Sequence, residues 1–167
     1  MKTLFAFVRK HRNTIITVLS IIAVSLPFFI HPYVVRGGSM TPTLSEGERL
    51  VVETFSIRIV PPKRGEILIF RNPHDKSVVE IKRVIGLPTE TVELDGSGVT
   101  VIYADGTQEH FENGTDIGGT SNSPYRIHLG PEDYFVLGDN RSQSSDSRTF
   151  GGVQQADLIG RPVSIFR

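Results

Sequence analysis

One segment of the sequence specifies the fold, and it reads Val78-Val79-Glu80-Ile81-Lys82-Arg83-Val84-Ile85. Its β-branched residues and the Gly-Leu-Pro that follows predict a strand. Alternation along that strand puts Glu80, Lys82 and Val84 on one face and Ile81, Arg83 and Ile85 on the other. A lysine in such an apolar setting can be partly buried, and burial disfavours the ammonium form. Lys82 is therefore a candidate general base, and the alternative is a solvated edge-strand lysine paired with Glu80.

Short strands separated by turn residues are predicted on both sides of this segment. The expected strands cover residues 33–36, 49–53, 65–70, 91–94, 99–103, 134–137 and 163–166. Residues 107–124 are polar and rich in Gly and Ser, which predicts a long excursion on the surface. After residue 31 only Gln154–Leu158 hints at helical periodicity. The sequence therefore predicts a mainly β domain over residues 31–167.

The composition excludes several classes of function. A chain of 167 residues suffices for one domain, and 18 basic and 18 acidic residues give a formal net charge of zero, which argues against a nucleic-acid partner. The absence of Cys excludes a cysteine nucleophile and thiolate metal sites. No histidine pair has metal-ligand spacing, so we predict neither a metal nor another cofactor. A Ser-His-Asp triad stays open, although no motif surrounds the histidines: His11, His31, His74, His110 and His128.

The N-terminal segment predicts a membrane anchor. Residues 13–30 contain no Asp, Glu, Lys or Arg and follow the basic residues Lys2, Arg9, Lys10 and Arg12. A helix over this segment is about 27 Å long, close to the thickness of a bilayer core. The positive-inside bias then predicts a cytoplasmic tail over 1–12 and a plasma-membrane protein with an extracytoplasmic domain over 31–167. The alternative is a cleaved secretory signal peptide, with Ala23-Val24-Ser25 as its cleavage site.

A serine follows two glycines at the end of an expected strand, in Gly37-Gly38-Ser39-Met40. The glycines permit unusual backbone angles and a close approach of another chain, which suits an exposed nucleophile. Thr41 stands where a G-x-S-x-G elbow needs its second glycine, so that motif is absent. Residues 138–148 form a third cluster, dense in short hydrogen-bonding side chains. Taken alone, the serine segment is equally a plain turn and the cluster a polar surface loop.

Together these segments resemble the type I signal peptidases, the Ser/Lys peptidases that remove secretory signal sequences. Four boxes carry the resemblance: Gly38–Leu44, Arg64–Phe70, Ile81–Pro88 and Gly138–Arg148. It implies Ser39 as the nucleophile, Lys82 as the general base, and a domain of coiled β-sheet with the signal-peptidase/LexA-like fold. By the same match Ser144 orients Lys82, and Asp146 forms a supporting ion pair with Arg148.

The expected site also includes two departures from the family pattern and a set of residues that contact the substrate. Gly37 stands where some members have a serine, so the oxyanion site is expected at the glycine segment Gly37-Gly38 and the Ser39 backbone N–H. Thr89 replaces the usual glycine after Leu-Pro and is expected to loosen that turn. Expected to line small apolar substrate pockets, or else to pack in the core, are Val35, Met40, Leu44 and Ile81.

The resemblance implies a membrane-bound serine endopeptidase that cleaves signal peptides from secreted preproteins through an acyl-enzyme. Its partners are then preproteins and the lipid bilayer, and we expect a monomer. Residues 55–60 are expected either to dip into the outer leaflet or to pack on the domain. Three alternatives remain: a self-cleaving repressor, which the anchor argues against; a non-enzymatic tethered β-domain, which the intact dyad argues against; and an organellar inner-membrane relative.

Overall fold

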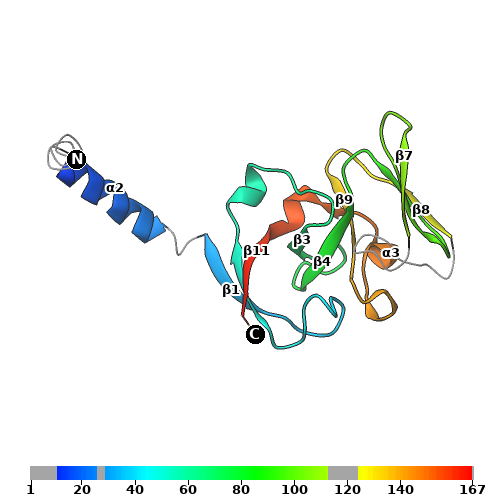
Figure 1. The fold of residues 1–167 in the computed structure, drawn as a ribbon, viewed down its shortest axis with the longest axis horizontal. Helices are drawn as coiled ribbons and strands as arrows, with labels where there is room; N and C mark the ends of the chain where they lie inside the picture. The colour runs from blue at the N-terminus through cyan, green and yellow to red at the C-terminus, as the bar shows by residue number, and fades with distance from the viewer. Residues whose placement is uncertain (1–10, 26–28, 113–123, 167) are drawn as a thin grey trace.

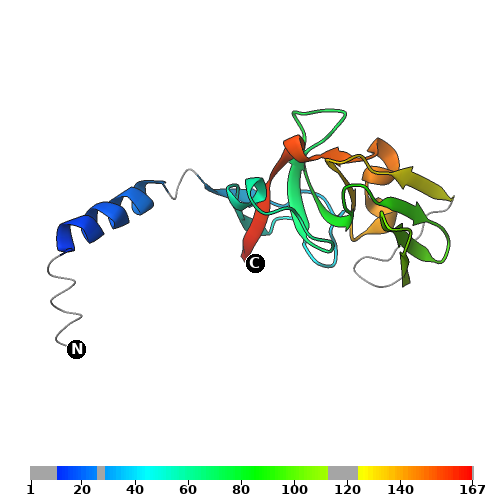
Figure 2. The ribbon, with the colours of Figure 1, turned by 90° about the horizontal axis from the view of Figure 1, so that it is seen from above.

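The described part of the chain is a helix followed by two antiparallel β-sheets. The computed structural model describes residues 11–25, 29–112 and 124–166. Figures 1 and 2 show helix α2 (Arg12–Ser25) projecting away from a body of curled strands. One sheet has seven strands in the order β1-β2-β11-β3-β4-β9-β10, and the other has four in the order β7-β6-β5-β8. The predicted mainly β domain is confirmed.

The larger sheet carries the serine and lysine boxes. Its strands are β1 (Ile30–Val34), β2 (Arg49–Glu53), β3 (Ile67–Arg71), β4 (Val79–Gly86), β9 (Asp133–Leu137), β10 (Val153–Gln154) and β11 (Leu158–Phe166). The smaller sheet consists of β5 (Thr91–Leu94), β6 (Gly98–Ile102), β7 (Gln108–Glu112) and β8 (Tyr125–His128). Short helical turns join them: η2 (Ser56–Arg58), η3 (Arg141–Gln143), α3 (Ser147–Phe150) and η4 (Gln155–Asp157).

Strand β4 is central, and its two faces pack in different cores. Val84 belongs to a buried cluster with Leu68 and Phe70 of β3. Ile85 points the other way into a second cluster, which it shares with residues of the smaller sheet such as Val92. The alternation predicted for this segment is therefore correct, because an apolar residue is needed on both faces of a strand buried between two layers.

The excursion expected over residues 107–124 is partly wrong. Gln108–Glu112 form strand β7, which pairs with β6. Four of its five residues are exposed, so the strand has no apolar alternation that sequence reading can detect. Residues 113–123 lie outside the described residues. Strand β8 and helix α3 were not predicted. Strand β11 begins at Leu158 rather than at residue 163, because the strand continues through Pro162 with an irregular register.

The predicted membrane helix differs from the observed one. Helix α2 has 14 residues, which makes it about 21 Å long. Ile30, the last residue of the predicted anchor, starts strand β1 instead, and residues 26–28 lie outside the described residues. Within the ranges that the structure describes, no helix combines the length and hydropathy needed to span a bilayer.

The turn after β4 keeps a left-handed backbone in spite of its threonine. Thr89 has φ 69°, a conformation that favours glycine. The Glu90 carboxylate holds the turn by accepting a hydrogen bond from the Leu87 amide at 2.7 Å and by pairing with Arg64 at 2.7 Å. A buried carboxylate therefore holds this backbone from inside, and the expectation that Thr89 loosens the turn stays a prediction.

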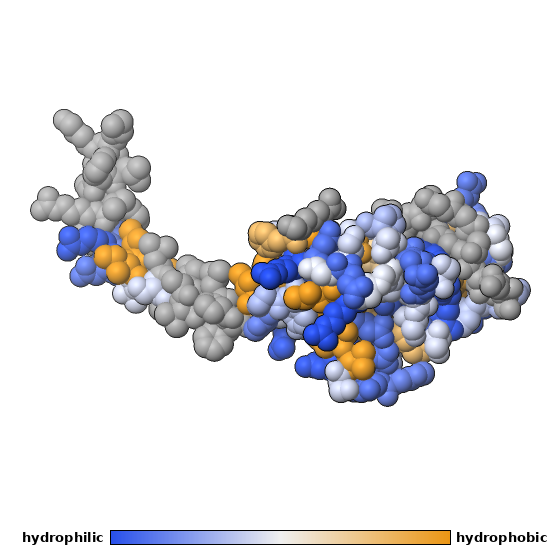
Figure 3. Space-filling view, turned by 90° about the horizontal axis from the view of Figure 1, so that it is seen from below, coloured by the Kyte–Doolittle hydropathy of each residue, from blue (hydrophilic) through white to orange (hydrophobic). Residues whose placement is uncertain are grey.

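Residues 55–60 are mostly exposed. Ile57 is buried in the core, but Phe55, Ile59 and Val60 are 51%, 64% and 47% exposed. Other exposed apolar side chains come from β1 and from the end of β11. Figure 3 shows that apolar surface gathers on the half of the β body nearer to helix α2, interspersed with polar side chains.

Candidate active site

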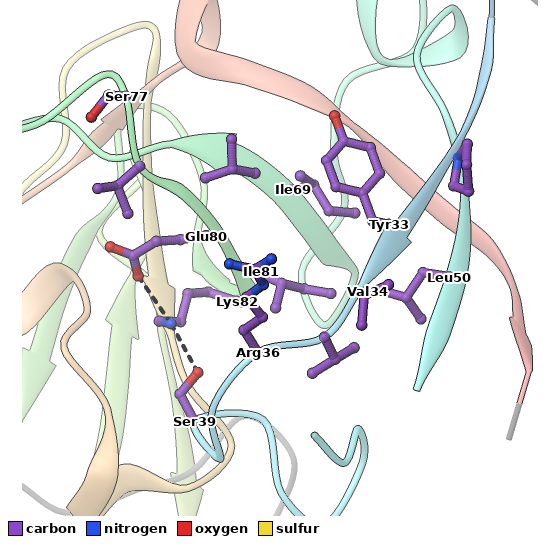
Figure 4. A pocket seen from close by; sticks show the side chains of 14 residues that line it. Tyr33, Val34, Arg36, Ser39, Leu50, Ile69, Ser77, Glu80, Ile81 and Lys82 are labelled. Carbon is purple, nitrogen blue, oxygen red and sulfur yellow. Dashed lines mark hydrogen bonds and ion pairs between the residues drawn. The ribbon is translucent and has the colours of Figure 1, made fainter. Parts of the chain in front are cut away.

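The side chains of Ser39 and Lys82 meet. Lys82 Nζ donates a hydrogen bond to Ser39 Oγ at 3.0 Å (Figure 4). Lys82 lies on β4 and is only 4% exposed. The alternative of a solvated lysine is therefore wrong. A buried amine beside a hydroxyl is the arrangement that a serine nucleophile with a lysine base requires.

The serine segment is held by the core and by the loop after β9. Gly37 has φ +75°, which a residue with a side chain rarely adopts, so the chain turns sharply just before Ser39. Met40 and Leu44 anchor the segment in a buried cluster with Leu50. The Ser39 carbonyl accepts a hydrogen bond from the Asn140 amide at 2.9 Å. In the described ranges the Ser39 amide donates to no protein oxygen, so it is available to a ligand.

Lys82 has a second polar partner. Its Nζ lies 3.0 Å from Glu80 Oε2, and the two side chains are 5% and 14% exposed. Asn72 Nδ2 donates to the other oxygen of the same carboxylate. The sequence predicted Glu80 and Lys82 on one face of β4, and their pairing was expected only for a solvated lysine. The structure shows the pair inside the protein, directly beside the nucleophile.

The opposite face of β4 is tied to the serine segment by Arg83. Its guanidinium binds both oxygens of Asp139 at 2.8 and 2.7 Å, the Gly65 carbonyl at 2.8 Å and Thr43 Oγ1 at 3.2 Å. Thr43 belongs to the serine box, and Asp139 to the loop that follows β9. One buried cation therefore links all four boxes, because Arg83 itself lies in the lysine box. This position was predicted only as part of the alternation, without a role in the site.

The predicted ion pair in the last box is present. Arg148 binds the Asp146 carboxylate through two nitrogens, at 2.8 and 2.9 Å, and Asp146 is fully buried. Asp146 Oδ2 also accepts the Gly138 amide at 3.1 Å, and the Gly138 carbonyl accepts Arg141 Nε at 2.7 Å. Burial lowers the pKa of the Arg141 guanidinium. These contacts fix the loop internally, and the bond from the Asn140 amide to the Ser39 carbonyl joins it to the serine segment.

The predicted contact between Ser144 and Lys82 is not formed. Ser144 Oγ instead lies 3.5 Å from the Ser145 carbonyl. Among the described residues, Lys82 Nζ contacts only Ser39 and Glu80 at hydrogen-bond or ion-pair distance. Ser144 packs against Gly138, where a Cβ would come within 2.2 Å of Ser144 Oγ and 2.6 Å of the Ser39 carbonyl oxygen. Gly138 is therefore a close-packing position, a role that its glycine alone does not reveal in the sequence.

A cleft of about 710 Å³ opens beside the serine and lysine. Strand β1 and the residues after it form one wall, and the first half of β4 forms the other (Figure 4). Val35 and Ile81 line it, as predicted for substrate contacts. Met40 and Leu44 do not: they are 1% and 0% exposed and pack in the cluster below Ser39, so their core reading is the correct one.

Other catalytic arrangements find no support near the cleft. The lining residues include no histidine. His110 and His128 instead bond to threonines on the smaller sheet. Within residues 11–25, 29–112 and 124–166, no cluster of three or more His, Cys, Asp or Glu has the geometry of a metal site.

The comparisons with known proteins agree with this geometry. A family model described as "Signal peptidase, peptidase S26" matches residues 8–166. The chain belongs to this signal peptidase family. A Synechocystis protein named "Probable signal peptidase I-1" is 34% identical over 165 residues, covering 94% of this chain and 82% of that protein.

Two further signal peptidases show the same likeness. "Signal peptidase I V" from Bacillus subtilis is 35% identical over 164 residues, covering 87% of this chain and 90% of that protein. A crystal structure of a signal peptidase I from Enterococcus faecalis aligns with a TM-score of 0.49 and 29% identity, over 61% of this chain and 97% of that one. The family match and the sequence relatives confirm the resemblance to signal peptidases and the prediction of an enzyme.

Proposed function

We propose that this signal peptidase is a membrane-bound serine endopeptidase that removes N-terminal signal peptides from secreted preproteins by a Ser39/Lys82 dyad. The observation that carries the proposal is the 3.0 Å contact between Lys82 Nζ and Ser39 Oγ, made by a lysine that is 4% exposed. Membership of the signal peptidase family supports the substrate class.

The dyad works through an acyl-enzyme. The neutral Lys82 amine takes the Ser39 proton while Oγ attacks the scissile carbonyl. The Ser39 amide, next to the flexible pair Gly37-Gly38, donates to the oxyanion, and such a donor stabilises the transition state by about 3 kcal/mol. The Lys82 ammonium then protonates the leaving amine of the substrate. The neutral Lys82 amine that this step regenerates activates the water that hydrolyses the acyl-enzyme ester.

The substrate binds as an extended strand in the cleft. Residues Val79–Lys82 pair with β3 on one edge, whereas pairing with β9 starts only at Arg83. β1 is the end strand of its sheet. Both cleft walls therefore have backbone groups available for an added strand, which is a common mode of peptide recognition. Val35 and Ile81 are placed to select small apolar side chains next to the cut.

The membrane places enzyme and substrate together. Residues 13–30 are uncharged and follow a basic N-terminal segment, which supports a single anchor in the plasma membrane with a cytoplasmic tail and an extracytoplasmic catalytic domain over 31–167. Few residues separate the end of the anchor from Ser39, so Ser39 lies within about 30 Å of that end. Exposed Phe55 and Ile59 lie on the half of the body nearer helix α2 and suit contact with lipid headgroups. The enzyme works as a monomer.

The test is preprotein cleavage by purified Ser39→Ala and Lys82→Ala variants in detergent. Each is expected to lower kcat/KM by about 10³-fold or more, because the nucleophile and its base act as a unit. Lys82→Arg should fail as well, since a guanidinium stays protonated. Ser97→Ala and Lys63→Ala, which change the same residue types far from the cleft, should cleave normally. Near-normal cleavage by either dyad variant would show that the dyad is misassigned.

A further inference from the structure

The dyad mechanism leaves one partly buried charge beside the nucleophile without a task. Glu80 lies two residues before Lys82 on the same face of β4, and its carboxylate is 3.0 Å from Lys82 Nζ. Figure 4 shows Ser39, Lys82 and Glu80 in one continuous row of contacts among the residues that line the cleft. Asn72 holds the second carboxylate oxygen. A carboxylate that only balanced surface charge would be solvated, and its two oxygens would not both be held by protein groups.

We propose that Glu80 is a positioning residue of this peptidase, which directs the Lys82 amine toward Ser39 and stabilises the ammonium formed when Lys82 takes the serine proton. The inference rests on the proposed function and extends the Ser39/Lys82 dyad to a third member. Glu80 takes the part that the resemblance assigns to Ser144, whose hydroxyl does not reach Lys82 in this structure.

The geometry explains how Glu80 directs the amine. A neutral amine has two N–H bonds and one lone pair, and to act as a base it must point the lone pair at the serine hydroxyl. A hydrogen bond from one N–H to Glu80 fixes the rotation about the last carbon–nitrogen bond of Lys82. Because Asn72 fixes the carboxylate in turn, the lone pair faces Ser39 without a loss of entropy at the moment of reaction.

The charge of Glu80 acts during the reaction. After proton transfer, it stabilises the ammonium that forms opposite the oxyanion, as the aspartate does for the imidazolium of a Ser-His-Asp triad. Removing the charge therefore slows the chemical step and leaves substrate binding nearly unchanged.

Other charged and titratable groups facing the pair are few. The cleft also contains the exposed Arg36 and the phenol of Tyr33. The β3 residues opposite Lys82 and Glu80 are Leu68 and Phe70, which carry no charge. On the loop side, Asp146 is already paired with Arg148. Among the described carboxylates, only that of Glu80 lies within ion-pair distance of the lysine.

The test compares kcat and KM of Glu80→Gln and the wild-type full-length enzyme in detergent, on one signal-sequence peptide. The kcat should fall by about tenfold or more with KM nearly unchanged, because the ammonium formed in the reaction loses its partner. Glu80→Asp keeps a carboxylate and should recover part of the lost kcat. Glu93→Gln, which neutralises an exposed ion pair with Arg126 on the smaller sheet, is the matched control.

A folded Glu80→Gln enzyme with wild-type kcat would overturn the inference and leave the dyad intact, and so would a Glu80→Asp enzyme that is no faster than Glu80→Gln. A merely structural role for Glu80 would lower the melting temperature without changing kcat. Failure of the proposed function is seen separately, as retained cleavage in Ser39→Ala or Lys82→Ala.

Discussion

The substitution Gly138→Ala tests how closely the loop after β9 must approach the nucleophile. An alanine Cβ at this position would lie 2.6 Å from the Ser39 carbonyl oxygen, where ordinary contact begins at 3.4 Å. The Ser39 backbone must then shift by about 0.8 Å, because a backbone atom cannot rotate away as a side chain can. The Asn140 amide, which bonds this same carbonyl at 2.9 Å, restricts the directions in which it can move.

A displacement of this size should affect catalysis more than folding. Misplacing a reacting group by about 1 Å costs about 10²-fold in rate, whereas overpacking costs about 1–3 kcal/mol of stability. We expect kcat/KM for a signal-sequence peptide to fall by about 10²-fold, and the melting temperature to show a folded protein. Gly96→Ala, where the added Cβ meets nothing within 4 Å, should change neither quantity. A folded Gly138→Ala enzyme with wild-type kcat/KM would refute the argument that this packing positions Ser39.

Two further predictions concern stability. Thr89→Gly should raise the free energy of unfolding by about 1 kcal/mol, because φ 69° is costly for a β-branched residue, and a loss of stability in denaturant titration would contradict this. Burial raises the pKa of Glu53, but hydrogen bonds from Ser56 and Phe55 and the charge of Arg161 outweigh it and hold that pKa below its ordinary 4.5. The carboxylate therefore stabilises the fold above pH 4.5 and loses this effect as the pH falls through its folded pKa. Glu53→Gln should be less stable than wild type at neutral pH and should lose less stability on acidification; equal losses in thermal melts would oppose the prediction.

The part of the site that lies on one strand could be predicted from the sequence. Alternation along β4 requires that Lys82 and Glu80 share a face and that Arg83 points away. The apolar residues around Lys82 allowed burial but also a solvated lysine paired with Glu80, and only the structure shows that Lys82 is buried. The resemblance supplied the partner that alternation alone cannot, namely Ser39 from a segment 43 residues earlier.

The contacts between segments were predicted less well. Val35, Met40 and Leu44 all follow the pattern of apolar residues near a nucleophile. All three pack in one buried cluster, and only the fold shows that Val35 also reaches the cleft. Ser144 was assigned to Lys82 by its place in a motif, but its hydroxyl packs on Gly138 and lies near the Ser145 carbonyl. The direction in which a loop runs decides such contacts. That direction is set by tertiary packing, which a local sequence pattern does not describe.

Strand β7 shows a different reason for failure. Its sequence Gln108–Glu112 is polar, and four of its five residues are exposed because it ends the smaller sheet. An edge strand with little apolar surface to bury is specified by backbone pairing with β6 and not by hydrophobic alternation. The turn at Asp105-Gly106 was the available signal, since Gly106 has a positive φ and leads directly into this hairpin.

The account depends on Ser39 becoming acylated by the substrate. That event can be observed by mass spectrometry of the full-length enzyme, quenched with acid during turnover of a signal-sequence peptide and then digested. The account predicts an adduct with the mass of the N-terminal substrate fragment on the peptide that contains Ser39, and none in Ser39→Ala. An adduct on another residue, or normal turnover by the Ser39→Ala enzyme, would contradict it.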